Sequence, residues 1–126
     1  MNVRVVLTVP DFDEAVAFYR DAVGLEQLAV WSGDDGRVIL LDAGHATLEL
    51  FDEQQAASVD RIEAGSRVSG TVRLALEVDD LDGIAQRLLA AGAKAEAEPV
   101  GRPGEAATRG FARPMGCSSR CSTRRR

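Results

Sequence analysis

The chain has 126 residues, of which 45% are hydrophobic and 28% are charged. This length supports one domain with its own core and leaves little room for a second. The composition is that of an ordinary globular protein, and no apolar run is long enough to span a bilayer. The first residues lack the basic and then apolar order of a secretory signal, so we expect a cytoplasmic protein without a membrane partner.

Charge is distributed unevenly along the chain. Residues 1–100 carry 19 acidic and 8 basic residues, whereas residues 101–126 carry 7 arginines and one glutamate. The acidic body repels phosphate backbones, which argues against nucleic acid as the main partner. The basic tail alone could form a nucleic-acid arm, but it lacks interleaved aromatic residues. We therefore expect no nucleic-acid partner.

The first 52 residues predict a strand, a helix and three more strands. Residues 3–9 alternate and are rich in β-branched side chains, which is typical of a strand. Asp11 and Glu14 form a capping-box arrangement at the start of a helix, and Gly24 is placed to end it. The apolar face of this helix is formed by Phe12, Val16, Tyr19 and Val23. Strands are predicted over residues 26–31, 37–42 and 46–51, with turns at 32–36 and 43–45.

The opening strand and helix recur after a connector at residues 53–70, which has room for a short helical turn. Arg4–Asp13 aligns with Arg73–Asp82 without gaps, and five of the ten aligned positions are identical, including Arg4 and Arg73. A second apolar helical face follows, formed by Leu81, Ile84, Leu88 and Ala91, with Gly92 at its end and a strand from residue 93. Such a repeat predicts two similar modules that bury their sheets together.

The order strand–helix–strand–strand–strand, found twice, resembles the vicinal-oxygen-chelate superfamily, which includes glyoxalases, bleomycin resistance proteins and extradiol dioxygenases. The residues that carry the resemblance are V-P-D-F-D-E-A-V-A-F-Y-R-D-A-V-G-L at 9–25, L-E-L-F at 48–51 and V-D-D-L-D at 78–82. The resemblance implies an α+β fold in which two βαβββ modules form cupped mixed sheets. We expect a single domain over residues 1–126, with module one at about 1–52, the connector at 53–70, module two at about 71–100 and an atypical tail at 101–126.

The tail departs from this family, whose members usually end with two more strands around a D-P-D-G-type turn. Residues 101–126 show no strand pattern, so we expect a second module that is incomplete at its C-terminal strands and leaves an open sheet edge. When the back-translated tail is read one nucleotide earlier, it allows P-W-G-x-R-N-A-R-[F/L]-R-x-P-D-G-L-Q-L-T-L-F, which is close to the family's ending. We therefore hypothesise a shift of the coding frame near residues 100–103. The alternative is a natural, poorly ordered tail, and the gene sequence distinguishes the two.

The resemblance also indicates where a metal would bind. In metal-dependent relatives, one ligand comes from the first strand of each module and one from the last strand of each module. The first-strand positions here are Arg4 and Arg73, whose guanidinium groups donate hydrogen bonds and offer no lone pair. Glu49 matches the third position, and no residue of the tail matches the fourth. Because one donor cannot hold an ion that needs several, we expect no metal and no cofactor.

Arg4 and Arg73 are equivalent in the repeat, so we expect them to approach one another across a local twofold axis. Two uses are open. The two guanidiniums could hold an anionic or carbonyl-bearing ligand, with Glu49 pairing one of them. They could instead form a structural Arg–Glu–Arg network within the sheet, since such networks produce the same pattern. Trp31 and Phe51 are further candidates to contact a ligand, because large aromatic side chains commonly line such sites.

The other chemically active residues favour ordinary structural roles. His45, the only histidine, lies in a predicted turn and is expected to be solvated rather than a catalytic base. Phe18 and Tyr19 are expected to pack in the core. Cys117 and Cys121 have no nearby histidine or third cysteine, so we interpret them as reduced thiols rather than a zinc site.

These observations favour a small-molecule-binding protein of the glyoxalase and bleomycin resistance type. We expect it to be metal-free, to sequester an organic ligand or antibiotic, to have no catalytic residues and to form a homodimer. The alternative is a metal-dependent lyase, isomerase or dioxygenase of the same fold. That alternative needs metal donors at positions that the predicted strand register does not supply.

Overall fold

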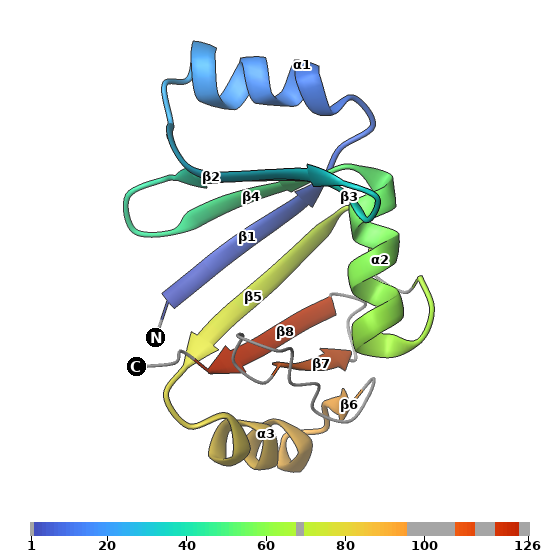
Figure 1. Ribbon diagram of the computed structural model, residues 1–126. Helices are drawn as coiled ribbons and strands as arrows, with labels where there is room; N and C mark the ends of the chain where they lie inside the picture. Colours follow the sequence, from blue (N-terminus) through green and yellow to red (C-terminus); the bar gives the residue numbers. More distant parts are fainter. Residues whose placement is uncertain (1, 68–69, 96–107, 113–117, 124–126) are drawn as a thin grey trace.

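A computed structural model of the chain describes residues 2–67, 70–95, 108–112 and 118–123. Eight strands form one sheet in the order β2-β3-β4-β1-β5-β8-β7-β6, and helices pack on both of its faces (Figure 1). The described part contains no helix long and apolar enough to cross a membrane.

The first module follows the predicted order. It contains β1 (Asn2–Thr8), α1 (Phe12–Val16), the π-helical segment η1 (Ala17–Ala22), β2 (Glu26–Gly33), β3 (Gly36–Asp42) and β4 (Thr47–Phe51). Asp11 caps α1 by accepting a hydrogen bond from the Glu14 amide, and Gly24 follows η1 with a positive φ, as the sequence predicts. β1 is parallel to β4, and β3 pairs antiparallel with both β2 and β4.

The predicted apolar face of the first helix is only partly correct. Phe12 and Val16 are buried, but Val23 is exposed. The cause is the π-helical turn, in which the Val23 amide donates to the Phe18 carbonyl five residues earlier. One extra residue in a turn rotates the following side chains around the helix axis, so they leave the face that the 3.6-residue period predicts. Phe18 is also exposed, so the expectation that it packs in the core is wrong; it lies two residues after Val16 and therefore on the opposite side of the helix, whereas Tyr19 packs against the core.

The second module repeats this topology. It contains β5 (Val72–Val78), α3 (Leu81–Ala90), β6 (Lys94–Ala95), β7 (Thr108–Ala112) and β8 (Ser118–Thr123). β5 is parallel to β8, and β7 pairs antiparallel with both β6 and β8, as in the first module. The α+β fold of two βαβββ modules is thus confirmed.

The second module is the less complete of the two. Its described strands β6 and β7 have two and five residues, where the corresponding β2 and β3 have eight and seven. The tail nevertheless supplies β7 and β8, for which its sequence shows no pattern. Strand pairing uses main-chain groups that every residue except proline provides in full, so a polar segment can continue a sheet without an alternating apolar pattern. The hypothesis of a shifted coding frame stays a prediction.

A local twofold axis relates the two modules. β1 and β5 pair antiparallel, and Val5 lies opposite Leu74. Since the repeat aligns Arg4 with Arg73, it also aligns Val5 with Leu74, so these two partners are each other's counterparts. The axis therefore passes between them, and the repeated strands meet at the centre of the sheet, as the sequence predicts.

The connector is more structured than its sequence suggested. It forms α2 (Glu53–Ala64), a helix of twelve residues that is capped by the Asp52 carboxylate and followed by Gly65 with a φ of +79°. α1 and α3 cover one face of the sheet, while Ala56 and Val59 of α2 pack on the other face against Val6, Val38 and Phe51. We call this second face, which carries β1 residues 4, 6 and 8, the inner face.

Candidate functional site

The pairing register places the predicted site residues together on the inner face. Val6 lies opposite Glu49 of β4 on one side and opposite Arg73 of β5 on the other. Directly paired residues point to the same face of a sheet, as do residues two apart along a strand. Arg4, Glu49 and Arg73 therefore share the inner face, and Arg4 and Arg73 are diagonal neighbours across the local twofold axis.

Arg4 forms an ion pair with Glu49. The distance from Arg4 Nη1 to Glu49 Oε2 is 3.5 Å, and 37% of the Arg4 side chain is exposed against 8% of the Glu49 side chain. At this distance the attraction is mainly electrostatic, because a good charge-assisted hydrogen bond is shorter than 3 Å. Arg4 is thus anchored at the sheet while solvent still reaches its guanidinium group.

Arg73 has a different environment from its repeat counterpart. Only 4% of the residue is exposed, and its Nη2 donates a hydrogen bond to Asp60 Oδ1 of α2. Its Nη1 also lies 3.7 Å from Glu63 Oε2, one helical turn further along α2. The surroundings of the two arginines therefore differ. Arg4 pairs with a carboxylate of the sheet, and Arg73 pairs with carboxylates of the helix that covers the sheet.

Asp60 joins two arginines at the centre of this cluster. Its Oδ1 accepts from Arg73, and its Oδ2 lies 2.9 Å from Nη1 of Arg67, in the segment that follows α2. Arg67 also donates from Nε to Glu53 Oε1 at 2.8 Å, and this hydrogen bond raises the pKa of Arg67 above its usual value. Because Asp60 is only 2% exposed, its negative charge is stabilised by these arginines and not by water.

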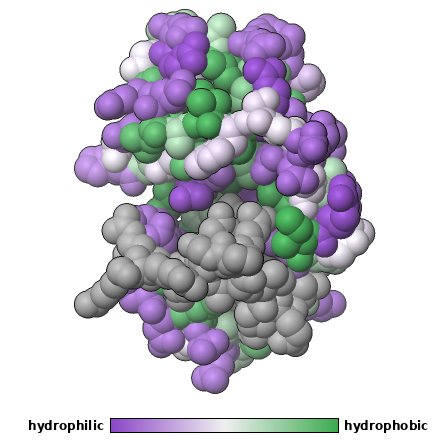
Figure 2. Space-filling view, in the orientation of Figure 1, coloured by the Kyte–Doolittle hydropathy of each residue, from purple (hydrophilic) through white to green (hydrophobic). Residues whose placement is uncertain are grey.

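The two aromatic candidates lie in one row of the inner face, because Trp31 pairs with Val38 and Val38 pairs with Phe51. Phe51 is 2% exposed and belongs to the core beneath α2, with the guanidinium carbon of Arg73 6.0 Å from its ring centroid. Trp31 is 57% exposed on the edge strand β2. Of the two, Trp31 is the one that a molecule on the inner face can contact from solvent. Figure 2 shows hydrophobic surface among hydrophilic residues in the upper part of the molecule, where Figure 1 places β2.

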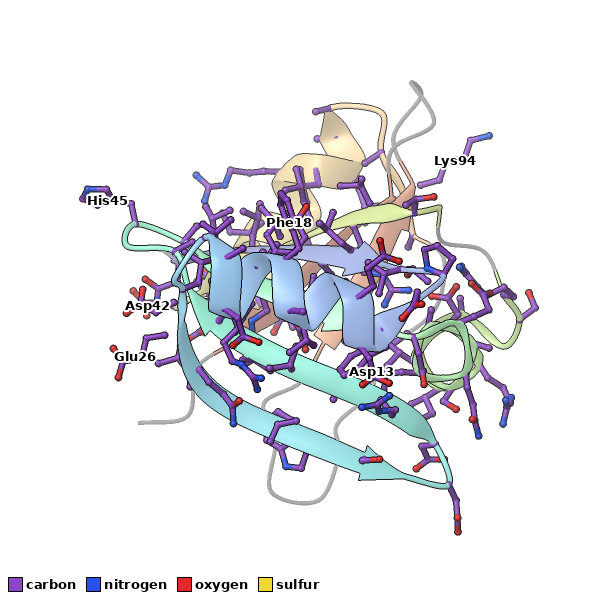
Figure 3. The ribbon with its side chains drawn as sticks, turned by 90° about the horizontal axis from the view of Figure 1, so that it is seen from above. Asp13, Phe18, Glu26, Asp42, His45 and Lys94 are labelled. Carbon is purple, nitrogen blue, oxygen red and sulfur yellow. The ribbon has the colours of Figure 1, made fainter. Side chains whose placement is uncertain are left out.

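His45 lies outside this arrangement. It is exposed in the turn between β3 and β4 and points away from the sheet, beyond the carboxylates of Asp42 and Glu26 (Figure 3). It lies at the end of the sheet, as expected of a solvated histidine in a turn. Of the two cysteines, Cys121 is placed in β8 and Cys117 lies outside the described residues.

The register also identifies the fourth symmetry-related position. Val5 pairs with Leu48, and its counterpart Leu74 pairs with Ser119, so Arg120 of β8 corresponds to Glu49 of β4. No residue of the tail was expected at this position, because its sequence predicts no strand there. The four positions are thus three arginines and one glutamate. A cation needs several lone-pair donors, and the described side chains at these positions are Glu49 and the guanidinium groups of Arg4 and Arg73, which offer no lone pair, so they do not fit a metal ion. Among the described residues, no group of three or more His, Cys, Asp or Glu side chains could hold a metal ion.

Sequence reasoning missed the three residues that surround Arg73 from the α2 side: Asp60, Glu63 and Arg67. A local signal was present, because Asp52 and Gln55 have the spacing of a helix cap and Gly65 is placed to end a helix. Asp60 and Glu63 are three residues apart and therefore lie on one helical face. Their partner could not be predicted, because nothing in the local sequence shows which strand that face meets.

Comparisons with known proteins agree with this topology. A family model described as Glyoxalase/Bleomycin resistance protein/Dioxygenase superfamily matches residues 3–114. A superfamily member from Vibrio splendidus 12B01 is structurally similar with a TM-score of 0.67 and 16% identity, covering 98% of both chains. Methylmalonyl-CoA epimerase from Mycobacterium tuberculosis is similar with a TM-score of 0.65 and 20% identity, covering 99% of this chain and 87% of that one.

A hypothetical protein from Bacillus halodurans C-125 is also similar, with a TM-score of 0.70, 14% identity and coverage of 98% of this chain and 93% of that one. No curated protein matches the sequence. At these identities the structural likeness shows the fold, whereas the family match spans most of the chain. The chain belongs to the Glyoxalase/Bleomycin resistance protein/Dioxygenase superfamily.

Proposed function

We propose that this protein binds a small organic molecule with an anionic group on the inner face, without a metal ion, and sequesters it without transforming it. The observation that supports this most is the residue set at the four symmetry-related positions. Arg4, Arg73 and Arg120 stand where a metal site needs donors, and Arg4 is half-exposed and only loosely paired with Glu49. A guanidinium group in this setting favours a carboxylate or a similar oxyanion. An antibiotic of that chemistry is one such ligand.

Trp31 supports the proposal and supplies its measurement. It is the only tryptophan of the chain and lies on the edge strand β2, three strands from Arg4, so its fluorescence reports ligands that reach this edge of the inner face. Isothermal titration calorimetry measures binding at Arg4 itself. We expect one or more anionic compounds from a panel of metabolites and antibiotics to change this fluorescence and to raise the melting temperature. The Arg4→Gln variant should bind such a compound about 10- to 100-fold more weakly, which corresponds to the loss of one charged hydrogen bond.

A matched control is available in Arg20→Gln. Arg20 is exposed on η1 and pairs with Asp21, away from the inner face, so this variant removes the same charge without touching the site. If Arg4→Gln and Arg20→Gln bind the panel compounds equally well, Arg4 does not hold the ligand and the proposal is wrong.

A second candidate function is a metal-dependent lyase, isomerase or dioxygenase. Its support is the similarity to structures named methylmalonyl-CoA epimerase. We expect purified protein to contain less than about 0.1 equivalent of nickel, zinc, iron or manganese, because three of the four positions carry guanidinium groups. Elemental analysis measures this, with protein incubated with each metal and then desalted as the comparison. Stoichiometric metal that survives desalting favours the second candidate.

We also propose that the protein is a cytoplasmic homodimer. Each protomer is a single domain over residues 1–126, with module one at about 1–52, a connector at 53–70 and a second module that begins at about residue 71. The support for a dimer is the edge strand β2, which exposes the large hydrophobic side chains of Leu28, Val30 and Trp31. Edge strands with exposed apolar side chains are usually covered by another chain or element. Size-exclusion chromatography with light scattering is expected to give twice the chain mass, and a monodisperse monomer would contradict the dimer.

A further inference from the structure

The repeat places two arginines on the inner face, but α2 supplies carboxylate partners to Arg73 and not to Arg4. Arg4 and Arg73 are diagonal neighbours, and such neighbours lie about 7–8 Å apart in a sheet. A ligand with two anionic groups could therefore reach both guanidiniums if both were available. Arg73, however, already pairs with two carboxylates that come from the same helix, Asp60 and Glu63.

The charges around Arg73 therefore disfavour a second anion. The two negative charges of Asp60 and Glu63 balance the two positive charges of Arg73 and Arg67, so the cluster offers a second anion no net positive charge. Both carboxylates are buried, so their fields are weakly screened by solvent. An anionic group that approached Arg73 would have to replace a carboxylate already bound there and would be repelled by the other.

We infer that α2 restricts the site to ligands with a single negative charge, and that Asp60 and Glu63 are its specificity-determining residues. This inference rests on the proposed function, because it assumes that Arg4 holds an anionic ligand. Without the two α2 carboxylates, Arg4 and Arg73 would form a site for a dianion. With them, Arg4 is the one of these two arginines that is left to bind an anion, and the cluster rejects a second anion at Arg73.

Butyrate and succinate test this directly, because both have four carbons and carry one and two carboxylates. Their affinities would be compared by isothermal titration calorimetry at constant ionic strength and neutral pH. We expect wild-type protein to bind succinate no more tightly than butyrate. In the Glu63→Gln variant, the ratio of succinate affinity to butyrate affinity should rise about tenfold, which is the effect of removing one nearby charge in a partly buried site.

Asp60→Asn is the second variant and should change the ratio in the same direction. This substitution keeps the size of the side chain. Because Asp60 also holds Arg73 in place, the thermal unfolding of the variant would be recorded first to establish that it is folded. Glu14→Gln serves as the control, since Glu14 is exposed on α1, on the other face of the sheet. A rise in the ratio in Glu14→Gln as large as in Glu63→Gln would contradict a local effect of α2.

The two proposals fail in different ways. If folded Glu63→Gln and Asp60→Asn proteins bind butyrate and succinate in the wild-type ratio, α2 does not set the charge preference and only the further inference is wrong. If binding of every anion is insensitive to Arg4→Gln, the proposed function itself is wrong. A wild-type protein that binds succinate through both arginines would also overturn the inference.

Discussion

Replacement of Asp60 by alanine is expected to lower the free energy of unfolding by about 3–5 kcal/mol, one of the largest effects for any side chain of this protein. Asp60 is buried and bonds both Arg73 and Arg67. When one partner of a buried ion pair is removed, the remaining charge has lost both water and counterion. The Arg73 guanidinium would keep its ion pair with Glu63 but would lose the hydrogen bond to Asp60, and Arg67 would lose its own contact with that carboxylate. Urea denaturation followed by circular dichroism measures the change.

Glu53→Ala is the control for this prediction. Glu53 also pairs with Arg67, but its side chain is mostly exposed, and exposed pairs contribute at most about 1 kcal/mol. The triple variant Asp60→Leu, Glu63→Leu and Arg73→Met should recover most of the stability, because it replaces Arg73 together with both of its buried carboxylates, and replacing a whole buried ion group by apolar side chains is often neutral. If Asp60→Ala costs no more than Glu53→Ala, Asp60 does not carry a buried charge that depends on Arg73.

The fold could be predicted from the sequence because its signals are local and occur twice. Asp11 and Gly24 mark the ends of the first helix through hydrogen bonds and a backbone angle that involve only nearby residues. The repeat of Arg4 at Arg73 then predicted the twofold relation of β1 and β5, which the pairing of Val5 with Leu74 confirms. The exposure of Val23 could not be predicted, because the π-helical turn before it breaks the regular helical period.

Only those residues of the candidate site that lie on predicted strands could be predicted from the sequence. Arg4 and Glu49 lie on one face because both belong to strands whose register follows from the family resemblance. The partner of Arg73 comes from α2, and its position depends on how the helix packs after the whole sheet has formed. Arg120 was missed for a related reason, since the polar sequence around it gives no sign of the strand that main-chain pairing produces.

Gly36→Ala is the second substitution with a large expected effect, because Gly36 sets where α2 begins. Gly36 has a φ of +113°, which side chains other than glycine rarely adopt, and this strain costs about 1–3 kcal/mol. A Cβ atom there would also lie 2.6 Å from Asp52 Oδ1 and against the Gln55 backbone amide, so the first turn of α2 would have to move. We expect a loss of about 2–5 kcal/mol in the free energy of unfolding.

Gly33→Ala separates this contact from a general effect on the hairpin. Gly33 lies opposite Gly36 across the β2–β3 turn, and a Cβ atom there would have no neighbour within 4 Å, so its replacement should change stability by less than about 1 kcal/mol. If both variants lose similar amounts of unfolding free energy, the destabilisation comes from the hairpin itself and not from its contact with α2. If Gly36→Ala alone is destabilised, the β2–β3 hairpin holds the N-terminus of α2 over the inner face. The same contact then determines where Asp60 and Glu63 meet Arg73, so the anion preference of a folded Gly36→Ala protein should shift in the direction of Glu63→Gln.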